Sequence, residues 1–254
     1  MHSHSEDSVK HGSLRTFVHN RYHDGMLLDV FHLELEQNYL NGKRWLLNRL
    51  ISGYGVLCGL DVVPAHHGRA VIVTPGVALD RGGHEVVVAH HSKPVALPVR
   101  PQTDATATEW KKEDFVHLCL SFAPCEADQT PTSVDDCGQP TACTPSAIQE
   151  RYKLYLREGK APEIICECSA PEVVLNGRLN YKVLAERITR HCPTVPHDLC
   201  IPLANICLPP GDTPPQGSNI DICVRPIVYT NDLLFDIILS LTGDSSARPR
   251  GGKQ

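Results

Sequence analysis

The sequence lacks most of the features that reveal a function directly. Aromatic residues make up 6% of its 254 residues, charged residues make up 21%, and the formal net charge is only -5. A chain this close to neutral has no excess of basic residues for binding nucleic acid. Its 41% of apolar residues excludes an intrinsically disordered chain. No apolar run is long enough to span a bilayer, so we expect no membrane span.

Recognised catalytic motifs are also missing. There is no GxSxG turn, no phosphate-binding P-loop, no HExxH motif, and no carboxylate pair at a spacing typical of acid–base catalysis. Cys192 with His191 or His197 could imitate a Cys–His nucleophile pair, but the sequence shows no group that would orient it. We therefore expect a protein that is not an enzyme.

The N-terminal residues, MHSHSEDSVKHG, are polar and rich in histidine, without the apolar region of a signal peptide. We therefore expect synthesis in the cytoplasm. In that compartment the eleven cysteines are more naturally thiols or metal ligands than disulfides, and their odd number excludes complete pairing within the chain. Residues 1–14 and 244–254 have no apolar pattern and are predicted to be disordered tails.

The stretch 21–88 is the most strongly patterned part of the chain. Asp29 is placed to cap a helix that we predict to run to about Ser52. On a helical wheel the apolar residues form two neighbouring stripes, which predicts two packing partners. One stripe holds Phe31, Leu35, Tyr39, Leu46 and Leu50, and the other holds Leu33, Leu40, Leu47 and Ile51.

Short β-rich runs follow this helix, with turn chemistry at Asp80–Gly83 between the last two. The runs are Val56–Val63, Ala70–Thr74 and Glu85–Val88. We predict that the helix and these strands, residues 15–98, form an assembly core. A linker rich in proline, threonine and alanine follows at 99–113.

Residues 114–243 are predicted to form a Cys-containing β region. Phe115–Phe122 and 148–157 both alternate with a period of two, so we expect them to pair and to leave 123–147 as an elaborated hairpin loop. The further elements are a helix at 180–191, a strand at Ile201–Leu208 and a final helix, Leu233–Leu241, capped by Asn231. That last helix is apolar on nearly every side, so it should be buried or docked on another chain.

These elements predict the α+β fold class. One long N-terminal helix packs on short antiparallel strands and hairpins, the Cys-containing β region follows, and a short helix ends the chain.

The loop 123–147 has little apolar content to fold it. Three thiolates of this loop could hold a zinc ion, and closing such a site would supply the missing folding energy. A fourth ligand is available from the Cys166–Cys168 pair or from the cluster at 191–200, which could also form a second site. The predicted ligands are Cys125, Cys137, Cys143, Cys168, Cys192, His197 and Cys200.

Two alternatives to zinc stay open for the loop cysteines. They could form disulfides if the protein ends up outside the cell, or they could be inert thiols. Cys58, Cys119 and Cys207 stand among apolar strand residues, which predicts buried free thiols for these three.

Three segments carry a resemblance to a known family. They are RYHDGMLLD at 21–29, EQNYLNGKRWLLNRLISGYGVLCGLDVV at 36–63 and VIVTPGVALDRGGHEVVV at 71–88. Together they resemble a family encoded with phage-tail-like contractile injection systems. The last segment alone is also similar to segments of phage tail-fibre and baseplate-associated proteins. The resemblance extends more loosely through PSAIQERYKLYL and CIPLANICL to NDLLFDIIL, so it covers most of residues 21–242.

This resemblance implies a structural or accessory component of a contractile, tail-like particle, baseplate- or fibre-associated, in an oligomeric assembly with other particle proteins. It implies no catalytic residue. A soluble metal-binding regulator or effector associated with such a system is the alternative. An enzyme that uses a cysteine or a zinc-bound water is a third hypothesis, and it would need an open coordination position on the metal.

Overall fold

The structure is a computed structural model that describes residues 16–99, 114–134, 140–164, 173–175, 178–189, 192 and 194–242. Side chains are described for all of these except 128–134, 140–145 and 175. The predicted tails, 1–14 and 244–254, and most of the predicted linker lie outside the described residues.

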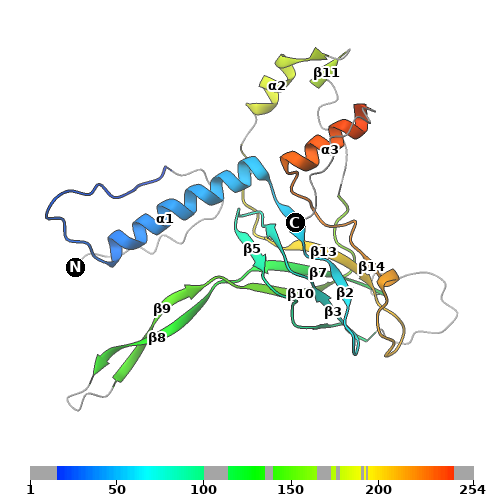
Figure 1. The fold of residues 1–254 in the computed structure, drawn as a ribbon, viewed down its shortest axis with the longest axis horizontal. Helices are drawn as coiled ribbons and strands as arrows, with labels where there is room; N and C mark the ends of the chain where they lie inside the picture. The colour runs from blue at the N-terminus through cyan, green and yellow to red at the C-terminus, as the bar shows by residue number, and fades with distance from the viewer. Residues whose placement is uncertain are drawn as a thin grey trace, which may run out of the picture.

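The fold is α+β, as predicted (Figure 1). The helices are α1 (Val30–Leu47), which continues into the π-helical turn η1 (Asn48–Ser52), α2 (Tyr181–Ile188), the 3-10 turn η4 (Gly217–Asn219) and α3 (Asn231–Thr242). The first strands are β1 (Gly55–Gly59), β2 (Val62–Pro64), β3 (Ala70–Val73), β4 (Gly76–Leu79), β5 (Glu85–Val88) and β6 (Val95–Ala96). The later strands are β7 (Phe115–Phe122), β8 (Cys125–Val134), β9 (Pro140–Gln149), β10 (Tyr152–Glu158), β11 (Val174–Leu175), β12 (Arg178–Leu179), β13 (Ile201–Cys207) and β14 (Ile220–Asp221).

Three sheets build the body of the molecule. Their strand orders are β1-β4-β5, β2-β3-β6 and β10-β7-β13-β14, while β8–β9 and β11–β12 are separate two-stranded sheets. The predicted pairing of Phe115–Phe122 with the strand near 152 is confirmed, since β7 and β10 pair antiparallel from Tyr152 opposite Phe122 to Glu158 opposite Val116.

One hydrophobic core joins the two predicted regions. Buried Val71 and Val86, from the first region, belong to the same cluster as Leu118 and Leu203, from β7 and β13. The middle of β7 is buried because β10 and β13 flank it and the other sheets cover it. Residues 15–98 and the β region after 114 therefore share a single core in the structure.

The predicted strand Val56–Val63 is wrong in one respect, because the chain turns in its middle. Leu60 has a φ of 58°, a left-handed conformation that ends β1 before β2 begins. Gly59 has a φ of 63° there, and its α-carbon lies so close to the Pro75 carbonyl that a side chain would collide with it. The two short strands consequently join different sheets.

The predicted hairpin also differs from the structure. Glu85–Val88 does not pair with Ala70–Thr74. It pairs with β4, from Gly76 opposite Val88 to Leu79 opposite Glu85, and the turn at Asp80–Gly83 connects these two strands. β3 instead pairs with β2 and β6. The turn was correctly placed, but the strand before it was missed.

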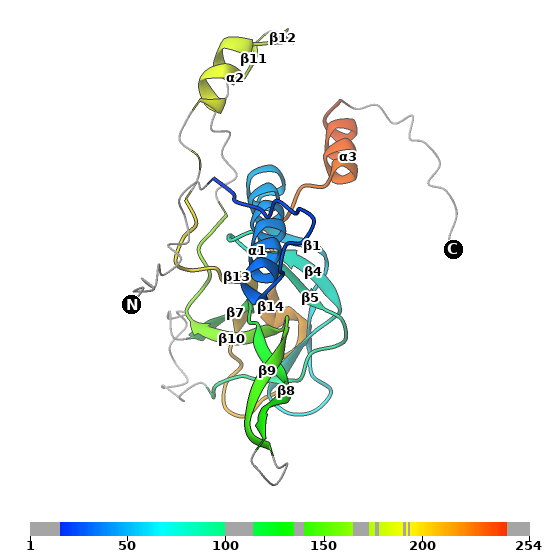
Figure 2. The same ribbon diagram turned by 90° about the vertical axis from the view of Figure 1, so that its left-hand side faces the viewer.

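The predicted loop 123–147 is itself an antiparallel hairpin in the structure, made of β8 and β9. It extends away from the sheets, on the side opposite α2 and α3 (Figures 1 and 2). The segment is therefore a β-hairpin held by backbone hydrogen bonds and not the irregular loop on which the zinc prediction was based.

Helices α2 and α3 stand away from the sheets in both views (Figure 2). In the described part of the chain, no helix is both long and apolar enough to cross a membrane.

A disulfide joins Cys119 of β7 to Cys200, which directly precedes β13. The two strands are neighbours in one sheet, and the two α-carbons lie 5.5 Å apart, a normal distance for such a bond. The prediction that Cys119 is a free thiol is therefore wrong, as is the prediction that Cys200 is a zinc ligand. Cys58 is exposed and Cys207 is half-buried, so these two thiols are not buried as predicted.

Candidate functional site

The longest helix of the molecule, α1, has no buried residue. Its start is as predicted, because the side chain of Asp29 accepts a hydrogen bond from the backbone N–H of His32 at 3.1 Å. This N-terminal end of the helix lies away from the sheets, and the helix runs toward them and ends beside them (Figure 1). Since most helices in globular proteins are stabilised by packing of an apolar face, this exposure is unusual and calls for a partner.

A short segment near the N-terminus covers one side of α1. The ring of Phe17 packs edge-on against Tyr39 at 6.3 Å, and the ring of His19 lies 5.0 Å from Tyr39. Buried Asn20 donates a hydrogen bond to the His32 carbonyl at 2.7 Å. This segment therefore partly covers the first predicted stripe.

The second predicted stripe has no cover from the described chain. Its four side chains are large, aliphatic and exposed: Leu33 at 58%, Leu40 at 59%, Leu47 at 56% and Ile51 at 77%. Of the two packing partners that the sequence predicted for this helix, the chain supplies one. A strip of aliphatic side chains along about five turns of a projecting helix is typical of a protein-binding surface.

The C-terminal end of α1 is held by a cluster around His84. The imidazole stacks flat on Phe122 of β7, with ring centroids 4.9 Å apart, and meets Trp45 of α1 edge-on at 4.5 Å. Its Nδ1 lies 2.8 Å from Oδ2 of Asp80, a carboxylate with no exposed surface. Asp80 also accepts from the backbone N–H groups of Gly82 and His84. The turn between β4 and β5 therefore holds the C-terminal end of the helix.

Polar contacts also hold this end of the helix against the β4–β5 turn. The side-chain amide of Asn48 donates to the Gly83 carbonyl at 2.9 Å and to Glu85 at 2.8 Å. The guanidinium of Arg44 lies 3.1 Å from the same Glu85 carboxylate. Gly83 has a φ of 91°, and a side chain there would collide with the backbone of Trp45. The helix is thus fixed at one end and projects at the other.

Sequence reasoning missed the cluster around His84. Asp80 was predicted as part of the turn, but His84 was not singled out, and Trp45 and Phe122 lie 39 and 38 positions away from it in the chain. No local periodicity links residues at such separations, so only tertiary packing shows that they meet.

The C-terminal helix α3 is a second exposed apolar surface. None of its twelve residues is buried. Its exposed apolar residues, which recur along one side, are Leu234, Phe235, Ile238 and Leu241. Of the two predicted states, buried or docked on another chain, the described chain does not provide the first.

The structure does not bring the predicted zinc ligands together. Cys137 and Cys168 lie outside the described residues, and only the backbone of Cys143 is described. On the hairpin Cys125 lies opposite Gln149, and Cys143 stands six positions before Gln149. Six strand residues span about 20 Å, too far for two thiolates that each bind within about 2.3 Å of one ion. The two cysteines therefore do not fit one zinc site.

The second predicted cluster loses one of its ligands to a disulfide. Cys200 is bonded to Cys119, while Cys192 and His197 are exposed. Among the residues that the structure describes, no three His, Cys, Asp or Glu side chains are grouped closely enough to hold a metal ion. Zinc on the cysteines that are not described stays a prediction from the sequence.

An ion pair joins β10 to the segment before β13. Arg157 makes two hydrogen bonds to Asp198, at 2.6 and 2.9 Å. These side-chain hydrogen bonds lower the pKa of Asp198 and raise that of Arg157. Both side chains are substantially exposed, so the pair adds little to stability. It is a surface contact between β10 and the segment before β13.

Comparisons with known proteins found no sequence match and a weak structural likeness. No protein-family model and no curated protein matches the sequence. The crystal structure of TssK aligns with 93% of this chain and with 51% of its own chain, at 14% sequence identity and a TM-score of 0.37. The chain thus spans about half the length of that protein. A likeness this weak carries no argument about function.

Proposed function

We propose that this chain is a structural component of a contractile phage-tail-like injection particle, associated with its baseplate or fibres. It acts by binding other particle proteins and not by catalysis. The observation that carries the proposal is that two helices with apolar stripes, α1 and α3, project from the sheets without a single buried residue. The sequence resemblance supplies the kind of assembly.

The physical argument concerns the stability of these helices. Isolated helices of 18 and 12 residues are marginal in water, because nucleation is costly and each added residue contributes little. Covering the apolar stripes would stabilise them by about 25 cal/mol per Å² of apolar surface removed from water. The described chain leaves these faces open, and in this proposal another protein or another copy covers them.

The hairpin β8–β9 supports the same conclusion. It pairs with no other strand of the described chain, and two-stranded hairpins are marginally stable alone in water. Ile148, near the base of the hairpin, is exposed at 74%. A partner that adds a strand or packs on this hairpin would stabilise it, which fits a protein held among several neighbours.

Co-purification with the particle tests the proposal. The tagged chain would be expressed together with the whole gene set of the particle, and intact particles would be isolated by sedimentation and examined by mass spectrometry. We expect the chain to remain with sheath, tube and baseplate proteins at a fixed ratio. A chain that never sediments with them contradicts the proposal.

A pair of variants locates the contact. The double variant Leu234→Asp/Ile238→Asp puts two charges on the exposed side of α3, so we expect the amount of chain in the particles to fall at least about tenfold. Val99→Asp alters an exposed aliphatic residue outside the helices and should leave incorporation unchanged. Equal incorporation of the double variant and the control would exclude α3 as the contact.

A further inference from the structure

The exposed stripe of α1 belongs to a longer heptad pattern. Residues that alternate in spacing between three and four lie along one seam of the helix: Val30, Leu33, Gln37, Leu40, Arg44, Leu47 and Ile51. The three leucines recur every seven residues, at the positions that leucine prefers in a two-stranded coiled coil. All seven side chains are at least partly exposed, and the aliphatic ones are more than half exposed. The seam is therefore complete and has no partner in the described chain.

Charge changes sign along this helix. Glu34 and Glu36 flank the seam in the N-terminal half, whereas Lys43 and Arg44 lie in the C-terminal half. A parallel pair of such helices would place Arg44 against Arg44 inside the seam, where like charges repel. An antiparallel pair would place the acidic turn of each helix against the basic turn of the other. The charge pattern is therefore self-complementary in one orientation only.

We propose that the seam binds a second copy of this chain, α1 against α1 in antiparallel order. Such a contact is isologous, since a two-fold axis through the middle of the helix makes both copies use the same residues. Leu40 of one copy packs beside Gln37 of the other, Val30 packs beside Leu47, and Glu36 faces Lys43. This inference rests on the proposed function, because it identifies one of the partners that the assembly component requires.

The charged side chains beside the seam have hydrogen-bond partners within the chain. Oε2 of Glu36 accepts hydrogen bonds from Asn20 at 3.3 Å and from Tyr22 at 3.4 Å. The ammonium group of Lys43 is 2.8 Å from the Tyr39 hydroxyl. Arg44 contacts Glu85, yet its side chain remains 47% exposed.

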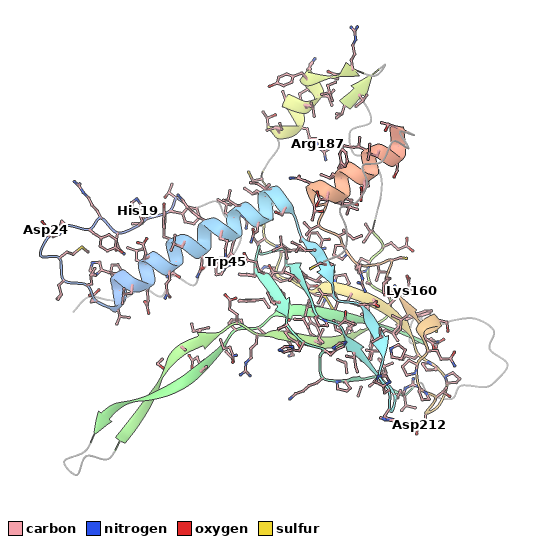
Figure 3. The ribbon with its side chains drawn as sticks, viewed as in Figure 1. His19, Asp24, Trp45, Lys160, Arg187 and Asp212 are labelled. Carbon is pink, nitrogen blue, oxygen red and sulfur yellow. A yellow bond between two sulfur atoms is a disulfide. The ribbon has the colours of Figure 1, made fainter. Side chains whose placement is uncertain are left out.

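The geometry of the molecule leaves this face accessible. His19 belongs to the N-terminal segment and lies on one side of α1. Trp45 lies on a different side, toward the sheets (Figure 3). Neither the N-terminal segment nor the β4–β5 turn reaches the seam far enough to bury any of its residues. Because α1 projects from the sheets, a second copy can approach along most of its length (Figure 1).

The first test measures self-association of the purified full-length chain by sedimentation equilibrium. We expect a dimer at micromolar concentration. Leu40→Asp puts a charge in the middle of the seam and should raise the dimer Kd by at least about a hundredfold, since two such charges enter each dimer. Ile188→Asp, at an exposed aliphatic position of α2, should leave the Kd unchanged. A chain that stays monomeric well above micromolar concentration overturns the proposal.

The second test determines the orientation. Glu36→Lys should weaken the dimer by about fivefold to tenfold, and the swap Glu36→Lys/Lys43→Glu should restore it, because each pair again joins opposite charges. In a parallel pair these two positions do not face each other, so the swap would bring no recovery. That result would overturn the antiparallel arrangement, and it does not require any variant to lose its fold.

A photo-crosslinking amino acid at position 33 gives an independent result. In the antiparallel dimer it should attach to the peptide that contains Arg44 of the second copy, as identified by mass spectrometry. Attachment to residues near 33 indicates a parallel pair and contradicts the proposal.

Failure of the pairing differs from failure of the proposed function. A monomeric chain that still enters the particle excludes the pairing alone. A dimeric chain that never enters the particle excludes the particle role alone.

Discussion

The strands β7 and β13 and the helix α1 all contain leucine residues, but their surroundings are opposite. β7 and β13 contain the fully buried residues Leu118, Leu120 and Leu203, whereas α1 has no buried residue. Leu118 and Leu120 of β7 pack in the hydrophobic core, whereas Leu33, Leu40 and Leu47 of α1 are exposed. Apolar residues thus hold the fold together in the strands, and we propose that those of α1 bind a partner.

The largest expected effect separates these two purposes. Leu118→Ala removes a fully buried side chain and leaves a cavity, so it should lower the free energy of unfolding by about 2–5 kcal/mol. Leu40→Ala removes an exposed side chain and should change the stability of the monomer by about 0.5 kcal/mol or less. Denaturant unfolding at a concentration too low for self-association measures both. Equal losses would show that α1 is packed in the monomer as firmly as β7.

The next effect concerns the contact between α1 and the turn that joins β4 to β5. Gly83→Ala should lower the free energy of unfolding by about 1–3 kcal/mol, because the φ of 91° is unfavourable and the new side chain meets the Trp45 backbone. Gly68→Ala is a matched control, since Gly68 has a φ of 76° but nothing within contact distance. If Gly83→Ala lowers the free energy of unfolding no more than Gly68→Ala does, the helix does not pack against this turn.

A smaller effect is expected from His84→Ala. The variant removes the ring between Trp45 and Phe122 and leaves the Asp80 carboxylate without its side-chain donor, at a cost of about 1–2 kcal/mol. Hydrogen exchange in the last turns of α1 should become faster, while exchange in β7 and β13 should change little. His66→Ala, at an exposed loop position, is the control. Unchanged hydrogen exchange in α1 would contradict the packing of this helix against the His84 turn.

The smallest effect is a dependence on pH at the start of α1. The backbone hydrogen bond from His32 lowers the pKa of Asp29 below its ordinary value of 3.8. The cap therefore contributes fully above that value, and its contribution is lost as the pH falls through the lower pKa of the folded state. Helical circular dichroism should decrease slightly in that acid range. Asn also caps helices but does not titrate, so Asp29→Asn should remove this component, and an identical pH profile would contradict the assignment.

Several elements could be predicted because they depend on neighbouring residues. Asp29 caps α1 as its carboxylate and position predicted, and the alternation of Phe115–Phe122 identified a strand that pairs with β10. The first stripe of α1 has part of its predicted cover in the N-terminal segment, whereas a partner for the second stripe stays a prediction. In each case the signal lies within a few residues, where backbone geometry converts spacing directly into a shared face.

Other features could not be predicted, because they join distant parts of the chain. The hairpin β8–β9 has little apolar content, so no periodic apolar pattern in the sequence predicts it. Cys119 and Cys200 are separated by 81 positions, and the odd number of cysteines did not indicate which of them pair. The zinc set proposed from composition depended on a loop that could bring its cysteines together, whereas strand pairing keeps Cys125 and Cys143 apart.

The sequence by itself therefore determined the fold class, the start of α1 and the apolar stripes that need cover, because these follow from local propensity and periodicity. Only the tertiary structure decided which stripe is covered and which stays open. That outcome depends on where the N-terminal segment, the His84 turn and the sheets come to lie around α1, and these contacts are set by packing between residues far apart in the chain.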